Sequence, residues 1–130
     1  VFIEIGSSEK EWNDKKAVKA AAEVILHLLD WENCEEAFVG VGGPHYAPNF
    51  TKLVLKGLNF GHICPKYSLG WLDKEMLLEM IRKTIPSPKS VVIDWKGTPG
   101  GKRKEIMEWG NRLGIEVKKV KDLKREKARE

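Results

Sequence analysis

Short apolar runs alternate with amphipathic stretches along most of this 130-residue chain. Between residues 8 and 29 the apolar positions recur at helical spacing, and Ser8 and Glu11 have the S-x-x-E form of a capping box, so this stretch predicts a helix. Residues 37–41 form a short β-rich run that ends at a pair of glycines, which predicts a buried strand. That strand would lead directly into a glycine-containing loop.

The same alternation continues to the end of the chain. The periodicity predicts helices over residues 49–56, 73–83 and 102–113, and strands over residues 1–5, 58–63, 91–94 and 115–120. Strands that alternate with helices of about three turns imply right-handed crossovers and a mostly parallel sheet. We therefore expect an α/β fold with helices on both faces of the sheet.

The length and the pattern indicate one α/β domain over residues 1–120. Residues 121–130 mix both charges with few apolar positions, which is typical of a solvated helix or a frayed charged tail. The chain begins inside the strand-like run of residues 1–5. We therefore expect that an upstream segment has been removed and that the chain is the C-terminal portion of a longer protein.

Composition excludes several broad classes of protein. Hydrophobic residues make up 42% and charged residues 32% of the chain, an ordinary globular balance that excludes a disordered protein. No apolar run approaches the roughly 20 residues that span a bilayer, so we expect a cytoplasmic protein without a membrane partner. The net charge of +4 is a weak indication of a polyanionic partner. The two cysteines exclude a disulfide framework and fit a reducing compartment.

Candidate chemistry is concentrated in loops that follow the predicted strands. His45 lies in a loop opened by Gly42 and Gly43, His62 closes the next strand-like run, and residues 95–103 form a third glycine-containing loop. Glycine allows close approach of the backbone to a ligand, and histidine titrates near neutral pH. Because ligands bind at the carboxyl ends of parallel strands, we expect the three loops to converge on one cleft. A structural turn in which His45 only caps a helix is the alternative.

Two ligand chemistries stay open on spacing alone. His62 and Cys64 face the same side of an extended strand, and with His45 they could supply the three ligands of a catalytic zinc ion. Dinucleotide-binding and P-loop motifs are absent from the sequence. Trp95 could stack on a ring or belong to the core. Six basic residues in or near the loops would either hold phosphate or be ordinary solvated charges: Lys52, Lys56, Lys66, Lys96, Lys102 and Arg103.

The string VGVGGPHYAP at residues 39–48, followed by FGHI at residues 60–63 and by Lys66-Tyr67, resembles the archaeal and plant type of D-aminoacyl-tRNA deacylase. The resemblance implies a zinc-containing esterase that releases D-amino acids from tRNA as chiral proofreading. It implies a fold similar to peptidyl-tRNA hydrolases and nucleoside phosphorylases, and the acceptor end of a D-aminoacylated tRNA as partner. We expect a monomer.

The resemblance also implies roles for individual residues. His45 would activate the hydrolytic water or bind the metal, and His62 would assist as a second catalytic group and metal ligand. The substrate-binding residues would be Gly42 and Gly43, which shape an oxyanion pocket, and Tyr46 and Lys66, which position the end of the tRNA.

This chain departs from the family pattern at two positions. Pro44 stands where a third glycine is common, and Asn49 stands where an arginine is common. Proline stiffens the loop and lacks an amide donor. Two other functions fit the same scaffold: a non-catalytic module that binds tRNA or a nucleotide, and an enzyme that acts on a free nucleoside.

Overall fold

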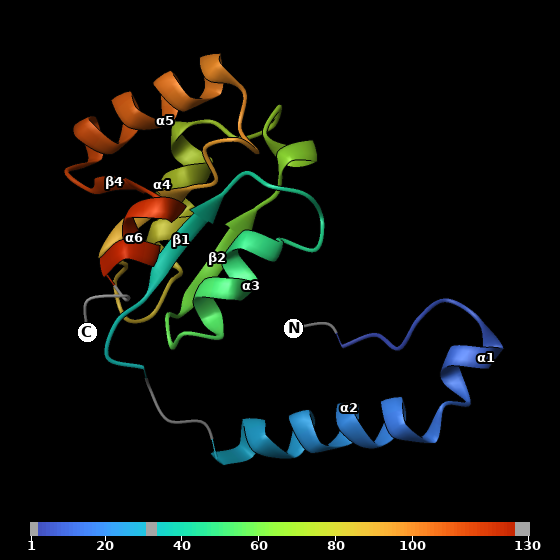
Figure 1. Ribbon diagram of the computed structural model, residues 1–130. Helices are drawn as coiled ribbons and strands as arrows, with labels where there is room; N and C mark the ends of the chain where they lie inside the picture. Colours follow the sequence, from blue (N-terminus) through green and yellow to red (C-terminus); the bar gives the residue numbers. More distant parts are fainter. Residues whose placement is uncertain (1–2, 31–33, 127–130) are drawn as a thin grey trace. The chain divides into compact units, whose positions relative to one another are not determined.

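The computed structural model describes residues 3–30 and 34–126 of the chain. The chain divides into two compact units, Val1–Asn33 and Cys34–Glu130, where the sequence pattern predicts one domain over residues 1–120. Figure 1 shows the ribbon of both units. None of the helices in the described ranges is both long and apolar enough to cross a bilayer.

The first unit is helical, but its predicted helix is interrupted. Helices α1 (Glu9–Trp12) and α2 (Lys15–His27) are separated because the carboxylate of Asp14 accepts hydrogen bonds from the amides of Lys16 and Ala17 and so caps a new helix. The predicted capping box does not form: the Ser8 side chain makes no hydrogen bond to the backbone of α1, and its hydroxyl donates to the Glu11 carboxylate instead. A short 3₁₀ turn, η1 (Leu28–Asp30), follows α2.

The first predicted strand does not form in the described residues. Residues 3–5 carry no strand, and residues 1–2 lie outside the described range. Within residues 3–30 no other strand forms beside residues 3–5, and a strand without a partner leaves its backbone groups unpaired.

The second unit is built on a four-stranded sheet. Its strands are β1 (Phe38–Val41), β2 (Phe60–Cys64), β3 (Ser90–Ile93) and β4 (Glu116–Lys119). All neighbouring pairs are parallel, and the order across the sheet is β2-β1-β3-β4. This arrangement confirms the predicted parallel sheet.

Four longer helices accompany the sheet: α3 (Pro48–Val54), α4 (Lys74–Arg82), α5 (Gly100–Leu113) and α6 (Val120–Glu126). Asp73 caps α4 by accepting a hydrogen bond of 2.7 Å from the amide of Met76. A short 3₁₀ turn, η2 (Lys66–Ser68), lies between β2 and α4.

The helices cover both faces of the sheet, as the sequence predicts. Consecutive side chains of a strand point to opposite faces, so Val91 and Val92 of β3 belong to two different cores. Val91 packs with Leu77 of α4 and Ile106 of α5. Val92 packs with residues of α3 and α6.

The sequence pattern indicates a solvated helix or a frayed charged tail over residues 121–130, but helix α6 forms here with one side buried. Val120 and Leu123 are only 6% and 3% exposed, and both belong to the core beneath α3. Their spacing of three residues places them on one side of a helix. Charged residues on either side make this short apolar face hard to recognise in the sequence, although it packs α6 against the sheet.

Candidate functional site at the carboxyl edge of the sheet

Three loops meet where the central strands end, and backbone hydrogen bonds hold them together. The Gly42 amide donates to the Cys64 carbonyl over 2.8 Å, and the Lys66 amide donates to the Gly43 carbonyl over 2.8 Å. The Gly43 amide donates to the Gly97 carbonyl over 3.2 Å. The predicted convergence of the loops after β1, β2 and β3 is therefore confirmed.

Gly42 and Gly43 make this convergence possible. Both have positive φ, 94° and 81°. A Cβ atom on Gly42 would lie 2.0 Å from the Thr98 hydroxyl oxygen, and one on Gly43 would lie 2.9 Å from a carboxylate oxygen of Asp94. Both amides already donate within the protein, so these two glycines shape the loop and are not available as donors to an oxyanion.

His45 lies exposed in this loop between two tyrosines. Its Nδ1 is 3.3 Å from the hydroxyl of Tyr67, and its ring meets that of Tyr46 edge-on with centroids 5.1 Å apart. Ala47, two residues later, has a left-handed backbone with φ of 45°. A non-glycine residue in this region is strained, and such strain is concentrated at functional sites.

His62 lies elsewhere than the sequence pattern places it. It is paired with Val39 inside β2 and does not lie in a loop beyond the strand. Its Nδ1 is 3.0 Å from the hydroxyl oxygen of Thr84, and that hydroxyl donates to the Met80 carbonyl over 2.7 Å. Since a hydroxyl has one proton, Nδ1 of His62 must be the donor to Thr84, which leaves Nε2 as an acceptor.

Replacing Thr84 by valine tests what the hydrogen bonds of the Thr84 hydroxyl contribute to stability. The Nδ1–H of His62 and the Met80 carbonyl would both lose their partner, so we expect the free energy of unfolding to fall by about 1–3 kcal/mol. Urea denaturation measures the change. Thr84→Ser keeps the hydroxyl and is the matched control. Equal stability of Thr84→Val and the unmodified protein would show that this hydrogen bond contributes nothing.

Cys64 shares a surface with His62, as their spacing predicts. Both side chains line a mainly apolar pocket of about 370 Å³ that also contacts Trp71 and Met76. Burial raises the pKa of the Cys64 thiol, while the charge of Lys102 acts in the opposite direction. A raised pKa disfavours the thiolate, so the surroundings of Cys64 do not activate it as a nucleophile.

The predicted zinc ligands are not assembled in this chain. Over residues 3–30 and 34–126, no three side chains of His, Cys, Asp or Glu gather into a possible metal site. His45 contacts Tyr67, whereas His62 is hydrogen-bonded to Thr84. Since zinc needs three protein ligands even at a catalytic site, His45, His62 and Cys64 do not fit this metal as placed here.

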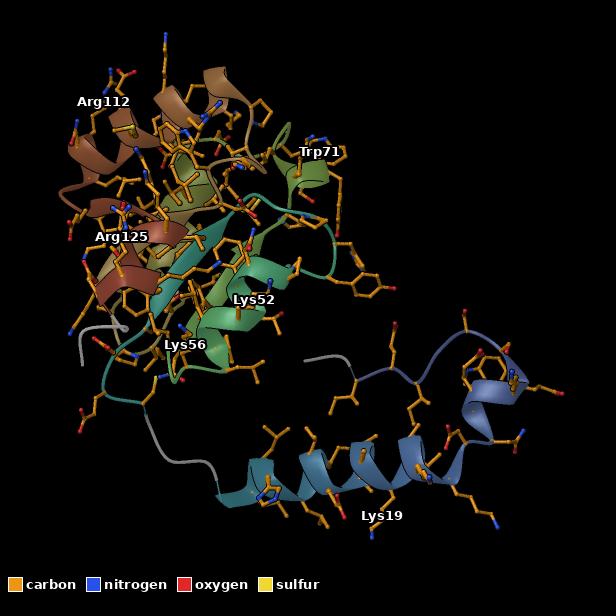
Figure 2. All side chains as sticks on the ribbon, viewed as in Figure 1. Lys19, Lys52, Lys56, Trp71, Arg112 and Arg125 are labelled. Atoms are coloured by element: carbon orange, nitrogen blue, oxygen red, sulfur yellow. The ribbon has the colours of Figure 1, made fainter. Side chains whose placement is uncertain are left out.

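The remaining predicted residues differ in exposure: Trp95, Lys102 and Arg103 are partly buried, whereas the others are exposed. Tyr46 is 87% exposed, and Lys66 contributes its amide to the loop while its side chain faces solvent. Lys52 is exposed on α3 and Lys56 in the turn that follows it, and both are labelled in Figure 2. Tyr46 and Lys66 are thus accessible to a large ligand at the same edge of the sheet.

The sequence pattern did not single out Asp94, whose buried carboxylate connects α3 to the loop after β3. It follows β3 directly, is 5% exposed, and accepts hydrogen bonds from the Asn49 side chain over 2.9 Å and from the Gly97 amide over 3.3 Å. The signal in the sequence was a carboxylate directly after the apolar run of residues 91–93. Asn49, noted only as a departure from a family pattern, is its partner.

The family model for D-aminoacyl-tRNA deacylase matches residues 1–118. The chain belongs to the D-aminoacyl-tRNA deacylase family. This membership confirms the resemblance inferred from the GGPHYAP loop.

Curated relatives with this name come from archaea. The D-aminoacyl-tRNA deacylase of Thermococcus kodakarensis is 43% identical over 118 residues, which cover 88% of this chain and 43% of the relative. The one from Pyrococcus furiosus is 39% identical over 123 residues, covering 94% and 44%. The chain thus spans less than half of the length of these deacylases.

A solved structure described as a conserved protein of unknown function has the same fold. It superposes with a TM-score of 0.80 at 34% sequence identity. The match covers 92% of this chain and 43% of that chain. The α/β architecture of this deacylase family member is therefore shared with a solved structure.

Proposed function

We propose that the whole protein hydrolyses the ester bond of D-aminoacyl-tRNA and releases the D-amino acid and free tRNA, which is chiral proofreading. The observation that carries the proposal is the GGPHYAP loop, held at the carboxyl edge of the sheet in a chain of the D-aminoacyl-tRNA deacylase family. His45 lies exposed within this loop.

In the proposed reaction His45 is the general base. Its Nδ1–H donates to the Tyr67 hydroxyl oxygen, so that Nε2 is free to take a proton from water. The water oxygen attacks the ester carbonyl, and the tetrahedral intermediate collapses by breaking the bond to the ribose oxygen. The proton held on Nε2 then passes to that ribose oxygen.

The developing oxyanion needs hydrogen-bond donors. Within the described residues, the amides of His45 and Tyr46 donate to no acceptor, whereas those of Gly42 and Gly43 are already used. We therefore assign the oxyanion donors to the two amides after Pro44. Free amides in a pre-shaped loop stabilise such a charge without further reorganisation.

The first test compares D- and L-aminoacyl-tRNA as substrates of the whole protein. We expect release of amino acid from the D-ester and little or none from the L-ester, measured on matched tRNAs. Release from neither ester, together with unchanged tRNA binding, would favour the non-catalytic tRNA-binding module instead.

Zinc is a separate proposal that rests on the family resemblance alone. Because His45, His62 and Cys64 do not assemble as ligands, a zinc ion in the whole protein would need ligands outside the described residues. We expect metal analysis of the purified whole protein to find zinc, and His62→Ala to leave the zinc content unchanged. Loss of zinc in His62→Ala would return His62 to the ligand set.

A further inference from the structure

A pocket of about 360 Å³ opens beside the loop of His45, at the carboxyl edge of the sheet. Its wall combines α3, the loop after β3, the end of β4 and the start of α6, which are segments far apart in the sequence. Six of its side chains matter here: Asn49, Trp95, Lys96, Lys119, Lys121 and Lys124.

The four lysines of this pocket are not neutralised by carboxylates. No ion pair joins any of them to an acidic side chain within residues 3–30 and 34–126. Lys118, the neighbour of Lys119 on β4, is different, because Glu126 lies 3.1 Å away and raises its pKa. Successive strand residues face opposite sides, so charge is neutralised on one face of β4 and left free on the other.

Two of these ammonium groups are held in place by uncharged partners. Nζ of Lys119 lies 4.1 Å from the ring centroid of Trp95, and Nζ of Lys124 donates to the Asn49 side-chain oxygen over 3.4 Å. A cation–π contact and an amide hydrogen bond orient a lysine without cancelling its charge. The pocket is therefore arranged for an anion before any ligand binds.

The pocket holds one carboxylate, that of Asp94, against the four ammonium groups, so its lining keeps a net positive charge. Asp94 is 5% exposed, and its two oxygens accept hydrogen bonds from Asn49 and Gly97. The same carboxylate packs against Gly43, so the pocket adjoins the loop that carries His45. An anionic chain bound in the pocket would continue toward the proposed reaction site.

We propose that this lysine pocket binds phosphodiester groups of the single-stranded acceptor end of the tRNA substrate. The inference rests on the proposed function, since it assigns the backbone contacts of that substrate. Four free ammonium groups exceed the charge of a single phosphodiester, which favours a run of successive phosphates. Lysines of α6, which the sequence pattern places in a solvated helix or a charged tail, are then part of the binding surface.

The test measures how strongly the whole protein binds a short fluorescent single-stranded RNA without an amino acid, at about 50 and about 200 mM salt. In Lys119→Gln/Lys124→Gln, each lost contact should reduce the slope of log affinity against log salt by roughly 0.7–1. We expect affinity at the lower salt to fall roughly tenfold or more, consistent with this loss of phosphate contacts. Lys119→Arg/Lys124→Arg should restore binding.

The matched control is Lys83→Gln/Lys89→Gln, which removes the same charge at the opposite edge of the sheet, where Lys89 precedes β3. This variant should bind RNA with nearly unchanged slope. Equal slopes for the two double variants would overturn the proposal. It would also be overturned if millimolar inorganic phosphate competed as effectively as unlabelled RNA, because that result would indicate a site for small anions. Because the RNA carries no aminoacyl ester, a whole protein that binds this RNA but does not hydrolyse D-aminoacyl-tRNA would count against the proposed function only.

Discussion

Replacing His45 by alanine is expected to lower kcat of the whole protein for D-aminoacyl-tRNA roughly 10²- to 10⁴-fold, the usual contribution of a general base. In the proposed reaction the imidazole removes a proton from water, and its Nδ1 lies 3.3 Å from the Tyr67 hydroxyl. Single-turnover hydrolysis of the D-ester measures the effect. KM should change little, since the proposed role of the imidazole is to act on water and not to hold the substrate in the ground state.

His27→Ala is the control for this loss of activity. His27 ends α2 and is exposed, so its removal should leave kcat unchanged. Tyr67→Phe separates positioning from chemistry, because it removes the hydroxyl 3.3 Å from Nδ1 and should lower kcat less than His45→Ala does. A His45→Ala protein within a few-fold of the original kcat would show that the base lies elsewhere.

Replacing Gly42 by alanine is expected to lower the free energy of unfolding by roughly 2–5 kcal/mol. A left-handed backbone costs a non-glycine residue about 1–2 kcal/mol. The added Cβ would also lie 2.0 Å from the Thr98 hydroxyl oxygen, and such overpacking costs about 1–3 kcal/mol more. Urea denaturation of the unmodified protein and the variant measures the sum.

Gly57→Ala isolates the backbone contribution. Gly57 has a similar positive φ of 85°, but a Cβ atom there would meet nothing within 4 Å. Its replacement should therefore cost only the backbone part, about 1–2 kcal/mol. If both variants lost the same stability, the close contact between Gly42 and Thr98 would not be a feature of the folded protein.

The sequence predicts the elements of the second unit closely, because their apolar periodicity reflects local geometry. The predicted strand at residues 91–94 and β3 at Ser90–Ile93 differ by one position at each end, and Asp73 caps α4 as its residue type indicates. The prediction of elements fails where a capping residue interrupts a helical pattern and where a strand-like run has no partner strand. Asp14 caps α2 and so interrupts the long predicted helix, and residues 3–5 do not form a strand.

The loop of His45 could be recognised from sequence, because its glycines, histidine and tyrosine are contiguous. The surroundings of His62 could not, since Thr84 lies 22 positions away and reaches it only through the packing of α4 beside β2. The two histidines therefore appear equivalent in the sequence and differ in the fold.

The sequence by itself determined the alternation of strands and helices and the glycine loop with His45, since both depend on residues that are neighbours along the chain. The tertiary structure alone decided which residues share a pocket. Lys124 reaches Asn49 across 75 positions, and Lys119 reaches Trp95 from another strand. Such contacts follow from the order of strands in the sheet, and periodicity along the chain carries no information about that order.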